Sequence, residues 1–231
     1  MEIKKEEWEK SYERGENFIF YPKEEVVKFI NRFIKKRVSF NKYTQILPSE
    51  KKLKGLDFGC GIGRTTILFH EFDIEGYGID ISQNAIENAK IFAKSFNFDL
   101  NNFFQVYNGK EIFFDDEYFD FIVSDCVLDS MPFELAKKLV KDIDRITKKY
   151  FFISLISMES KGLFKCINND NIHEIEVNEE HEKGTIQSLF NKEKIDELIK
   201  DTNFKIKWCE LHNIENYDNY IHGRWYLVLE K

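Results

Sequence analysis

Leu56-Asp57-Phe58-Gly59-Cys60-Gly61-Ile62-Gly63-Arg64 is the stretch of sequence that decides the fold of this chain. An apolar run over residues 52–58 leads into three glycines at alternate positions, and the residues that follow have the apolar spacing of a helix. This pattern predicts a buried strand, a tight turn and the start of a helix. Glycine suits such a turn because it adopts backbone angles that other residues resist, and because it lets a ligand approach the amides at the helix N-terminus.

Two classes of ligand are bound by turns of this kind. A dinucleotide fold has the pattern G-x-G-x-x-G, and counting from Gly59 puts its third glycine at the position of Arg64. The pattern present here, an acid at Asp57 followed by G-x-G-x-G, resembles motif I of the class I S-adenosylmethionine (SAM) methyltransferases. The resemblance implies that Gly59, Gly61 and Gly63 lie beneath the methionine part of SAM. It also implies that Asp57 helps to hold the ammonium group of SAM, directly or through water.

Length and composition set the outer bounds. The 231 residues suit one domain with a full core. A net charge of −7 argues against a nucleic-acid partner, which requires clustered Lys and Arg. No apolar run approaches the roughly 20 residues that cross a bilayer, and the first residues lack a signal-peptide pattern, so we expect a cytoplasmic protein without membrane insertion. The four cysteines are far apart and form no C-x-x-C, which predicts reduced thiols and no metal site.

The rest of the chain alternates between strand and helix patterns. Strands are expected at 76–80, 103–106, 118–124 and 151–156, and helices at 65–72, 82–96 and from Pro132 onward. Such alternation predicts a parallel sheet with right-handed crossovers. The resembled family implies an α/β fold of three layers, a Rossmann-like sheet of seven mostly parallel strands with helices on both faces and an antiparallel last strand at 224–230. A further helix is expected from Pro22 to a basic last turn at Lys35-Lys36-Arg37.

Aromatic residues gather among charges near the N-terminus, at Trp8, Tyr12, Phe18, Phe20 and Tyr21. Exposing such rings to water is unfavourable, so they are expected to cover another surface. One interpretation is an amphipathic helix packed on the domain, and the other is a mobile flap over the cofactor. The string W-x-x-x-Y-x-x-G followed by F-Y-P resembles the N-terminal segment of a group of small bacterial methyltransferases. That resemblance implies that Tyr12 and Tyr21 close the cofactor site.

Asp80 ends the strand expected at 76–80 and lies 17 positions beyond Gly63. In the resembled family this place borders the ribose of the cofactor. The resemblance therefore implies that Asp80 accepts hydrogen bonds from both ribose hydroxyls and that Ile81 belongs to the same site. NAD enzymes place an acid similarly, and Asp80 can instead act as a partial cap of the next helix.

Asn108-Gly109 follows the third strand, where the resembled family often carries an Asp that binds the adenine amine. An Asn accepts a hydrogen bond through its carbonyl but carries no charge. The resemblance therefore implies an adenine contact at Asn108 and Gly109. A plain Asn-Gly turn explains the two residues equally well.

Asp125-Cys126-Val127-Leu128-Asp129-Ser130-Met131-Pro132 follows the fourth strand, and ligands of open α/β sheets bind beyond such strand ends. The stretch resembles motif IV of the family, with V-L-x-x-x-P in place of the N-P-P-Y tetrad of enzymes that methylate adenine bases or glutamine amides. Asp129 or Asp125 can act as a general base toward a hydroxyl or can anchor an amine, and Asp125 is also expected beside the cofactor. Ser130 stands where many relatives have a histidine, and we expect it at the substrate. Each of the three can instead be a turn or cap residue.

The C-terminal third contains the remaining candidates. Residues 157–189 are polar and acid-rich, and we expect a solvated insertion at the substrate mouth without metal binding, since His173 and His181 lack ligand spacing. If the strand at 204–211 is parallel to the first strand, its exit loop reaches the glycine turn. We then expect five residues near the pocket. His222 and Arg224 hold an anionic substrate or move a proton, Tyr217 and Tyr220 bind the substrate, and His212 is interpreted as an ordinary surface or core histidine.

These features indicate a SAM-dependent methyltransferase in a single domain, 1–231, with an aromatic flap at 1–22 and the insertion at 157–189. We expect it to move a methyl group from SAM to an oxygen or nitrogen of a small polar acceptor, leaving S-adenosylhomocysteine. The resembled group occurs in surface-polysaccharide pathways, which implies a sugar or a phosphorylated amino-alcohol as acceptor, and a monomer or homodimer is expected. The alternatives are a SAM-binding regulator without catalysis and an NAD-dependent oxidoreductase.

Overall fold

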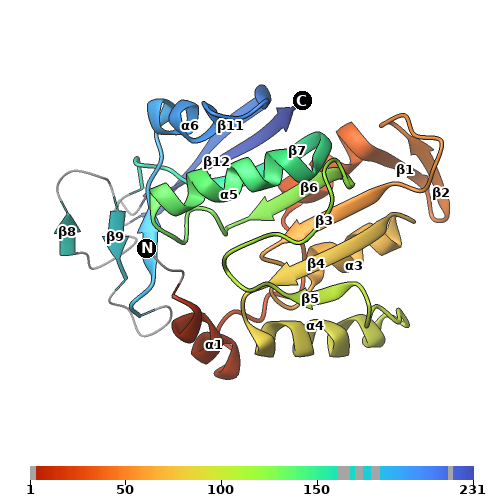
Figure 1. Ribbon diagram of the computed structural model, residues 1–231, viewed down its shortest axis with the longest axis horizontal. Coiled ribbons are helices and arrows are strands. Elements are labelled where there is room, and N and C mark those ends of the chain that lie inside the picture. The colour runs from red at the N-terminus through yellow and green to blue at the C-terminus, as the bar shows by residue number, and fades with distance from the viewer. Residues whose placement is uncertain (1–3, 161–166, 170–173, 178–182, 218–220) are drawn as a thin grey trace.

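The computed structural model describes residues 4–160, 167–169, 174–177, 183–217 and 221–231. Its centre is a seven-stranded sheet in the order β11-β12-β7-β6-β3-β4-β5 (Figure 1). The strands are β3 (Lys54–Phe58), β4 (Glu75–Asp80), β5 (Phe104–Val106), β6 (Phe119–Asp125), β7 (Thr147–Ile156), β11 (Lys205–Glu215) and β12 (Ile221–Glu230).

The direction of each strand agrees with the expected fold. The strands β3 to β7 run parallel to one another, and β12 is inserted antiparallel between β7 and β11. β11 is therefore parallel to β3. The expected Rossmann-like sheet with an antiparallel last strand is confirmed, and the carboxyl ends of β3, β4 and β6 meet at one edge.

Helices cover both faces of this sheet (Figure 1). The helices α5 (Phe133–Ile146) and α6 (Lys192–Ile199) pack on one face. The opposite face is covered by α2 (Glu24–Phe29), the π-helical turn η1 (Ile30–Ile34) and α3 (Arg64–Glu71). Two further helices, α4 (Gln83–Ser95) beside β5 and α1 (Lys5–Glu13) against α4, complete the layers.

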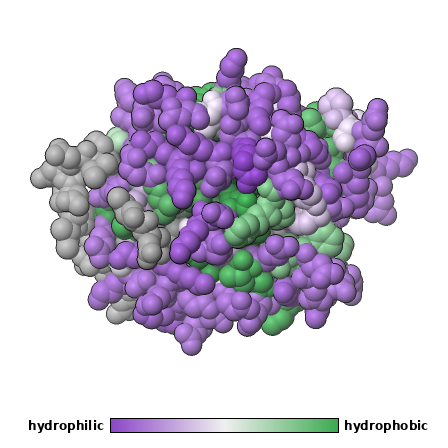
Figure 2. Space-filling view, in the orientation of Figure 1, coloured by the Kyte–Doolittle hydropathy of each residue, from purple (hydrophilic) through white to green (hydrophobic). Residues whose placement is uncertain are grey.

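The sequence of α5 shows how a helix is fixed to the sheet. Leu139, Val140 and Ile143 recur at helical spacing and are fully or almost fully buried. Its outer side is charged, and Figure 2 shows hydrophilic residues over α5, with apolar residues exposed in the middle of the face below it. Burial of one apolar stripe therefore holds α5 against β6 and β7.

The helix expected from Pro22 to Arg37 ends early, which corrects the sequence prediction. The basic residues at 35–37 belong to β1 (Lys35–Ser39), which pairs with β2 (Lys42–Gln45) in a hairpin. The side chain of Asn31 donates to the Val27 carbonyl and accepts the N–H of Arg37. These bonds give the backbone an alternative to the next helical turn, so the chain leaves the helix at this point.

The inserted segment 157–189 forms a small sheet of β8 (Ile167–Asn169), β9 (Glu174–Glu176) and β10 (Ile186–Ser188). It is less solvated than predicted, because Gln187 and Ser188 in β10 are buried and the N–H of Ser188 donates to the Asp129 carbonyl (2.7 Å). His173 and His181 lie outside the described residues. In the described part of the chain, no helix has the length and apolar character to cross a membrane.

The glycine turn between β3 and α3 has the predicted form. Gly59, Gly61 and Gly63 all have positive φ, at +75°, +54° and +85°. A Cβ on Gly63 would lie 2.6 Å from the ring of Phe104, so this glycine also allows the turn to pack against β5. Local backbone freedom and close packing therefore both require glycine at this position.

Replacing Gly63 with alanine tests this double requirement. Gly63→Ala is expected to lower the free energy of unfolding by about 2–4 kcal/mol, because strain at positive φ adds to overpacking against Phe104. Gly15→Ala is the matched control, since Gly15 has φ +74° and nothing within 4 Å of the added Cβ. It should cost only about 1–2 kcal/mol. Urea unfolding measures both, and equal losses would contradict the packing role of Gly63.

Candidate functional site

A cavity of about 460 Å³ opens at the carboxyl ends of β3, β4 and β6. This volume lies within the range of small-molecule sites. Residues from the N-terminal segment, the glycine turn, the ends of β4 and β6, and β12 share its wall. They include Trp8, Tyr12, Asn17, Gly59, Gly61, Arg64, Asp80, Ile81, Tyr107, Asp125, Cys126, Ser130, Gln187, His222 and Arg224.

Asp80 connects the end of β4 to the glycine turn. Its Oδ2 accepts the N–H of Gly61 and its Oδ1 accepts the N–H of Ser82, each at 2.9 Å. Ser82 in turn caps α4 by accepting the N–H of Ala85 (3.1 Å). Burial raises the pKa of Asp80, and the backbone N–H bonds partly oppose this rise. The carboxylate thus lines the cavity and also fixes the glycine turn and the start of α4.

Asp57 and Gly63 are not part of the cavity wall and instead support it from the start of α3. The Oδ2 of Asp57 accepts both the N–H and the hydroxyl of Thr66, at 3.1 and 3.0 Å, so Asp57 fixes the first turn of α3. Gly63 is the N-cap of α3 and packs on Phe104. Burial raises the pKa of Asp57 to about 7, while its bonds to Thr66 act in the opposite direction.

The N-terminal helix α1 covers the glycine turn. A Cβ on Gly61 would lie 2.6 Å from the hydroxyl of Tyr12, so Tyr12 sits directly over this glycine. Glu9 accepts the N–H of Asn84 (3.2 Å), which attaches α1 to the start of α4. The predicted contact of Tyr21 with the cofactor is corrected, because Tyr21 is 82% exposed and is not part of the cavity wall. Only the backbone carbonyl of Tyr21 approaches the site, where it accepts a hydrogen bond from Arg64.

The expected adenine contact is also corrected. Asn108 and Gly109 are not part of the cavity wall. The Oδ1 of Asn108 accepts the N–H groups of Lys110 and Glu111, at 2.8 and 3.1 Å, and this closes an Asn-Gly turn. The preceding residue, Tyr107, lines the cavity instead, with its ring against Phe58.

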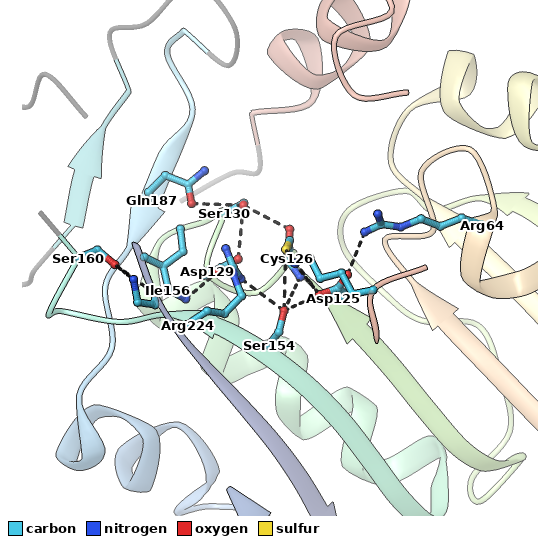
Figure 3. Close-up of polar contacts among 12 residues, drawn as sticks. Arg64, Asp125, Cys126, Asp129, Ser130, Ser154, Ile156, Ser160, Gln187 and Arg224 are labelled. Carbon is cyan, nitrogen blue, oxygen red and sulfur yellow. Dashed lines mark hydrogen bonds and ion pairs between the residues drawn. The ribbon is translucent and has the colours of Figure 1, made fainter. Parts of the chain in front are cut away.

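Asp125 is held between two cations at the end of β6, and Figure 3 shows one of them, Arg64. Its carboxylate pairs with Arg64 (2.9 Å) and Lys23 (3.1 Å) and accepts the hydroxyl of Ser154 (2.7 Å). Burial alone would raise the pKa of Asp125, but Lys23 and Arg64 outweigh it and the pKa falls. An ion-paired carboxylate with a lowered pKa is a weak proton acceptor, so the geometry disfavours Asp125 as a general base.

Asp129 is fully buried and lies outside the cavity wall, which corrects its predicted place at the reacting atoms. Its Oδ2 accepts from Nη1 of Arg224 (2.7 Å) and from the N–H of Ile156 (2.9 Å), as Figure 3 shows. Both partners compete with any proton or amine of a substrate. Asp129 is therefore a positioning residue that orients Arg224.

Three residues predicted at the acceptor, Ser130, His222 and Arg224, do line the cavity. The pKa of His222 is lowered by burial and by the charges of Arg224 and Lys23. Tyr217 is fully exposed and outside the wall, which corrects its predicted substrate contact. Tyr220 lies outside the described residues.

Several contributors to the site were missed by sequence reasoning. Lys23, Ser154 and Gln187 are distant along the chain from the motifs, and no local pattern marks them. Cys126 lines the cavity with φ +62°, a backbone strain that only the folded turn reveals. One contributor did have a signal in the sequence. Arg64 stands where a dinucleotide-binding motif has its third glycine, and its side chain pairs with Asp125.

Comparison with known proteins identifies the class. Residues 49–230 match the family described as a methyltransferase domain, and the chain belongs to that family. A curated relative, an uncharacterized protein of Haemophilus influenzae, is 28% identical over 96 residues, which cover 41% of this chain. The match spans only 38% of that relative's length. The predicted family, a methyltransferase domain, is confirmed.

Solved structures share the fold at low sequence identity. A SAM-dependent methyltransferase of Methanosarcina mazei is 21% identical with a TM-score of 0.65, over 79% of this chain and 94% of that one. Magnesium protoporphyrin IX methyltransferase of Synechocystis with bound SAM is 16% identical with a TM-score of 0.55, over 78% and 70%. These likenesses agree with a class I methyltransferase fold.

The buried Asp57 carboxyl makes stability depend on pH. Its folded-state pKa of about 7 lies above the ordinary 3.8, so the stability it contributes is full below pH 4 and is lost as the pH rises through 7. Asp57→Asn removes this dependence. The stability of wild type relative to Asp57→Asn should therefore fall by about 2 kcal/mol between pH 5 and pH 7. Urea unfolding at several pH values measures it, with the exposed Asp115→Asn as control, and a difference that does not change with pH would refute the assignment.

Proposed function

We propose that this protein transfers a methyl group from SAM to an oxygen or nitrogen of a small polar acceptor and releases S-adenosylhomocysteine. The observation that carries the proposal is the bond from Gly61 to Asp80 inside the cavity. It joins a bare glycine turn to a carboxylate at the end of the next strand, which is the arrangement that a nucleoside cofactor requires. The family match supports the same reaction class.

The residues at this end of the cavity fit SAM. Each carboxylate oxygen of Asp80 accepts one backbone N–H and keeps lone-pair capacity for a ribose hydroxyl. Tyr12 limits the space over Gly61, so any side chain at position 61 would fill the space between Tyr12 and the glycine turn. We assign Tyr12, Gly59, Gly61, Asp80 and Ile81 to the cofactor, and Trp8 covers it with Tyr12.

The acceptor end is formed by β12 and the loop after β6. SAM supplies a methyl group on a positively charged sulfur, and the protein contributes alignment and exclusion of water. His222 pairs with Ile214 of β11 through its backbone, while its ring lines the cavity and has no side-chain hydrogen bond to another described residue. It accepts the proton of the acceptor's hydroxyl or amine as the new bond to carbon forms and the carbon–sulfur bond breaks, with the electron pair remaining on sulfur.

The finer expectations are part of the same proposal. The N-terminal segment 1–22 acts as a flap over the cofactor, because Trp8 and Tyr12 line the cavity. The segment 157–189 helps to form the substrate mouth, which the position of Gln187 supports. The resemblance noted above supports a sugar or a phosphorylated amino-alcohol of a surface-polysaccharide pathway as acceptor, and a cytoplasmic monomer or homodimer.

Cofactor binding separates this proposal from an oxidoreductase. Calorimetric titration should detect binding of SAM and S-adenosylhomocysteine and none of NADH. Asp80→Asn should weaken SAM at least about 10-fold, because it removes charge-assisted bonds to the ribose. Asp115→Asn, an exposed acid away from the cavity, is the control and should bind as wild type does. Binding of NADH without SAM would overturn the proposal.

The role of His222 predicts a distinct pH profile. Because its pKa is lowered, the rate should fall only at pH values below the ordinary histidine value of 6.5, as the imidazole takes up a proton. His222→Gln should lower kcat by roughly 10²- to 10⁴-fold and remove this limb of the profile. His212→Gln is the matched control, since His212 pairs with Glu210 outside the cavity wall. An unchanged profile in His222→Gln would exclude the proton-transfer role, whereas SAM binding without turnover of any acceptor would favour a regulator.

A further inference from the structure

Arg224 presents donors to the cavity that no described residue uses. Its Nη1 donates to Asp129 (2.7 Å) and to the hydroxyl of Ser154 (3.3 Å). Among the described residues, Nε and Nη2 have no hydrogen-bond partner, although the side chain is only 8% exposed and lines the cavity. A guanidinium presents a planar fork of five N–H donors, so its unused side matches a second oxyanion.

The fixed orientation of Arg224 makes this side a built feature. Asp129 and Ser154 hold one end of the guanidinium, as Figure 3 shows, and Asp129 is itself held by the N–H of Ile156. Nε and Nη2 are not among the fully buried atoms that lack a partner, so they are open to the cavity. A bound anion would accept hydrogen bonds from both of them.

The charged residues around the acceptor end also leave an excess of positive charge, which favours an anionic ligand. Three cations, Lys23, Arg64 and Arg224, face two carboxylates, Asp125 and Asp129, and each carboxylate is already paired. The lowered pKa of His222 keeps its ring neutral near pH 7. One positive charge therefore remains at this end, while Asp80 lies at the cofactor end. The expected anchoring of a cationic amine by Asp129 does not agree with this balance.

We propose that the acceptor carries a compact oxyanion, a carboxylate or a phosphoryl group, that binds to Nε and Nη2 of Arg224. This inference rests on the proposed methyltransferase function and names its substrate class. His222 and Arg224 are two residues apart on β12 and so share a face, at a spacing of about 7 Å along the strand. The acceptor therefore presents its reacting hydroxyl or amine to His222 a few bonds away from its anionic group.

The test uses the full chain labelled with ¹⁵N and two probe anions, inorganic phosphate and acetate, titrated at constant ionic strength against chloride. The Nε–H signal of Arg224, assigned by its loss in Arg224→Lys, should shift with saturation. Arg224→Lys keeps the charge beside Asp129 but lacks the second side of the fork, so anion affinity, followed in both proteins through the backbone amide signals of β12, should fall at least about 10-fold. Arg32→Met removes a distant arginine charge, since Arg32 stacks over Trp208, and should leave the affinity unchanged.

The outcomes separate the sources of the oxyanion and the two levels of the proposal. Saturation by acetate alone supports a carboxylate, by phosphate alone a phosphoryl group, and by both an oxyanion site that accepts either. No saturable shift with either probe, or equal affinity in Arg224→Lys, overturns the inference. SAM titration of the same samples is independent of this result: failure to bind SAM overturns the methyltransferase function, whereas SAM binding without anion binding overturns only the Arg224 site.

Discussion

The bond from the Gly61 amide to the Asp80 carboxylate is the constraint on which the site depends. It connects the turn after β3 to the end of β4, so two loops that belong to different crossovers become one rigid surface. The second oxygen of Asp80 reaches Ser82, which starts α4. A buried carboxylate is stable here because backbone N–H groups solvate both of its oxygens. The cofactor end of the cavity is thereby organised before any ligand binds.

The acceptor end is organised by ion pairs rather than by free acids. Asp125 and Asp129 stand in the stretch where the sequence predicts a general base. Each of them is instead the counter-ion of an arginine, Arg64 for Asp125 and Arg224 for Asp129. Buried ion pairs of this kind add little net stability to the fold. Leaving one charge buried without its partner is costly, however, so each carboxylate keeps its arginine in the paired orientation. The carboxylates therefore position cations at the cavity, and the ring of His222 is the group that we propose as the proton acceptor at this end.

Sequence reasoning succeeded where chemistry is local. The glycine turn, the order of strands and helices, and Asp80 at a strand end follow from spacing alone. It was less decisive where a residue had two possible roles. Tyr12 lies over Gly61 whereas the side chain of Tyr21 is exposed, and of the two interpretations of Asn108 the structure supports the Asn-Gly turn. It failed again at the π-helical turn, where Asn31 ends a helix that the apolar pattern would have continued.

The amino-acid sequence by itself determined the α/β alternation and the glycine turn, because hydrophobic period and backbone freedom are properties of neighbouring residues. Only the tertiary structure decided which acids face the cavity. Lys23 reaches Asp125 and Arg224 reaches Asp129 across about a hundred residues of chain. The protonation and direction of a buried carboxylate depend on partners that strand order brings together, and no local pattern encodes those partners.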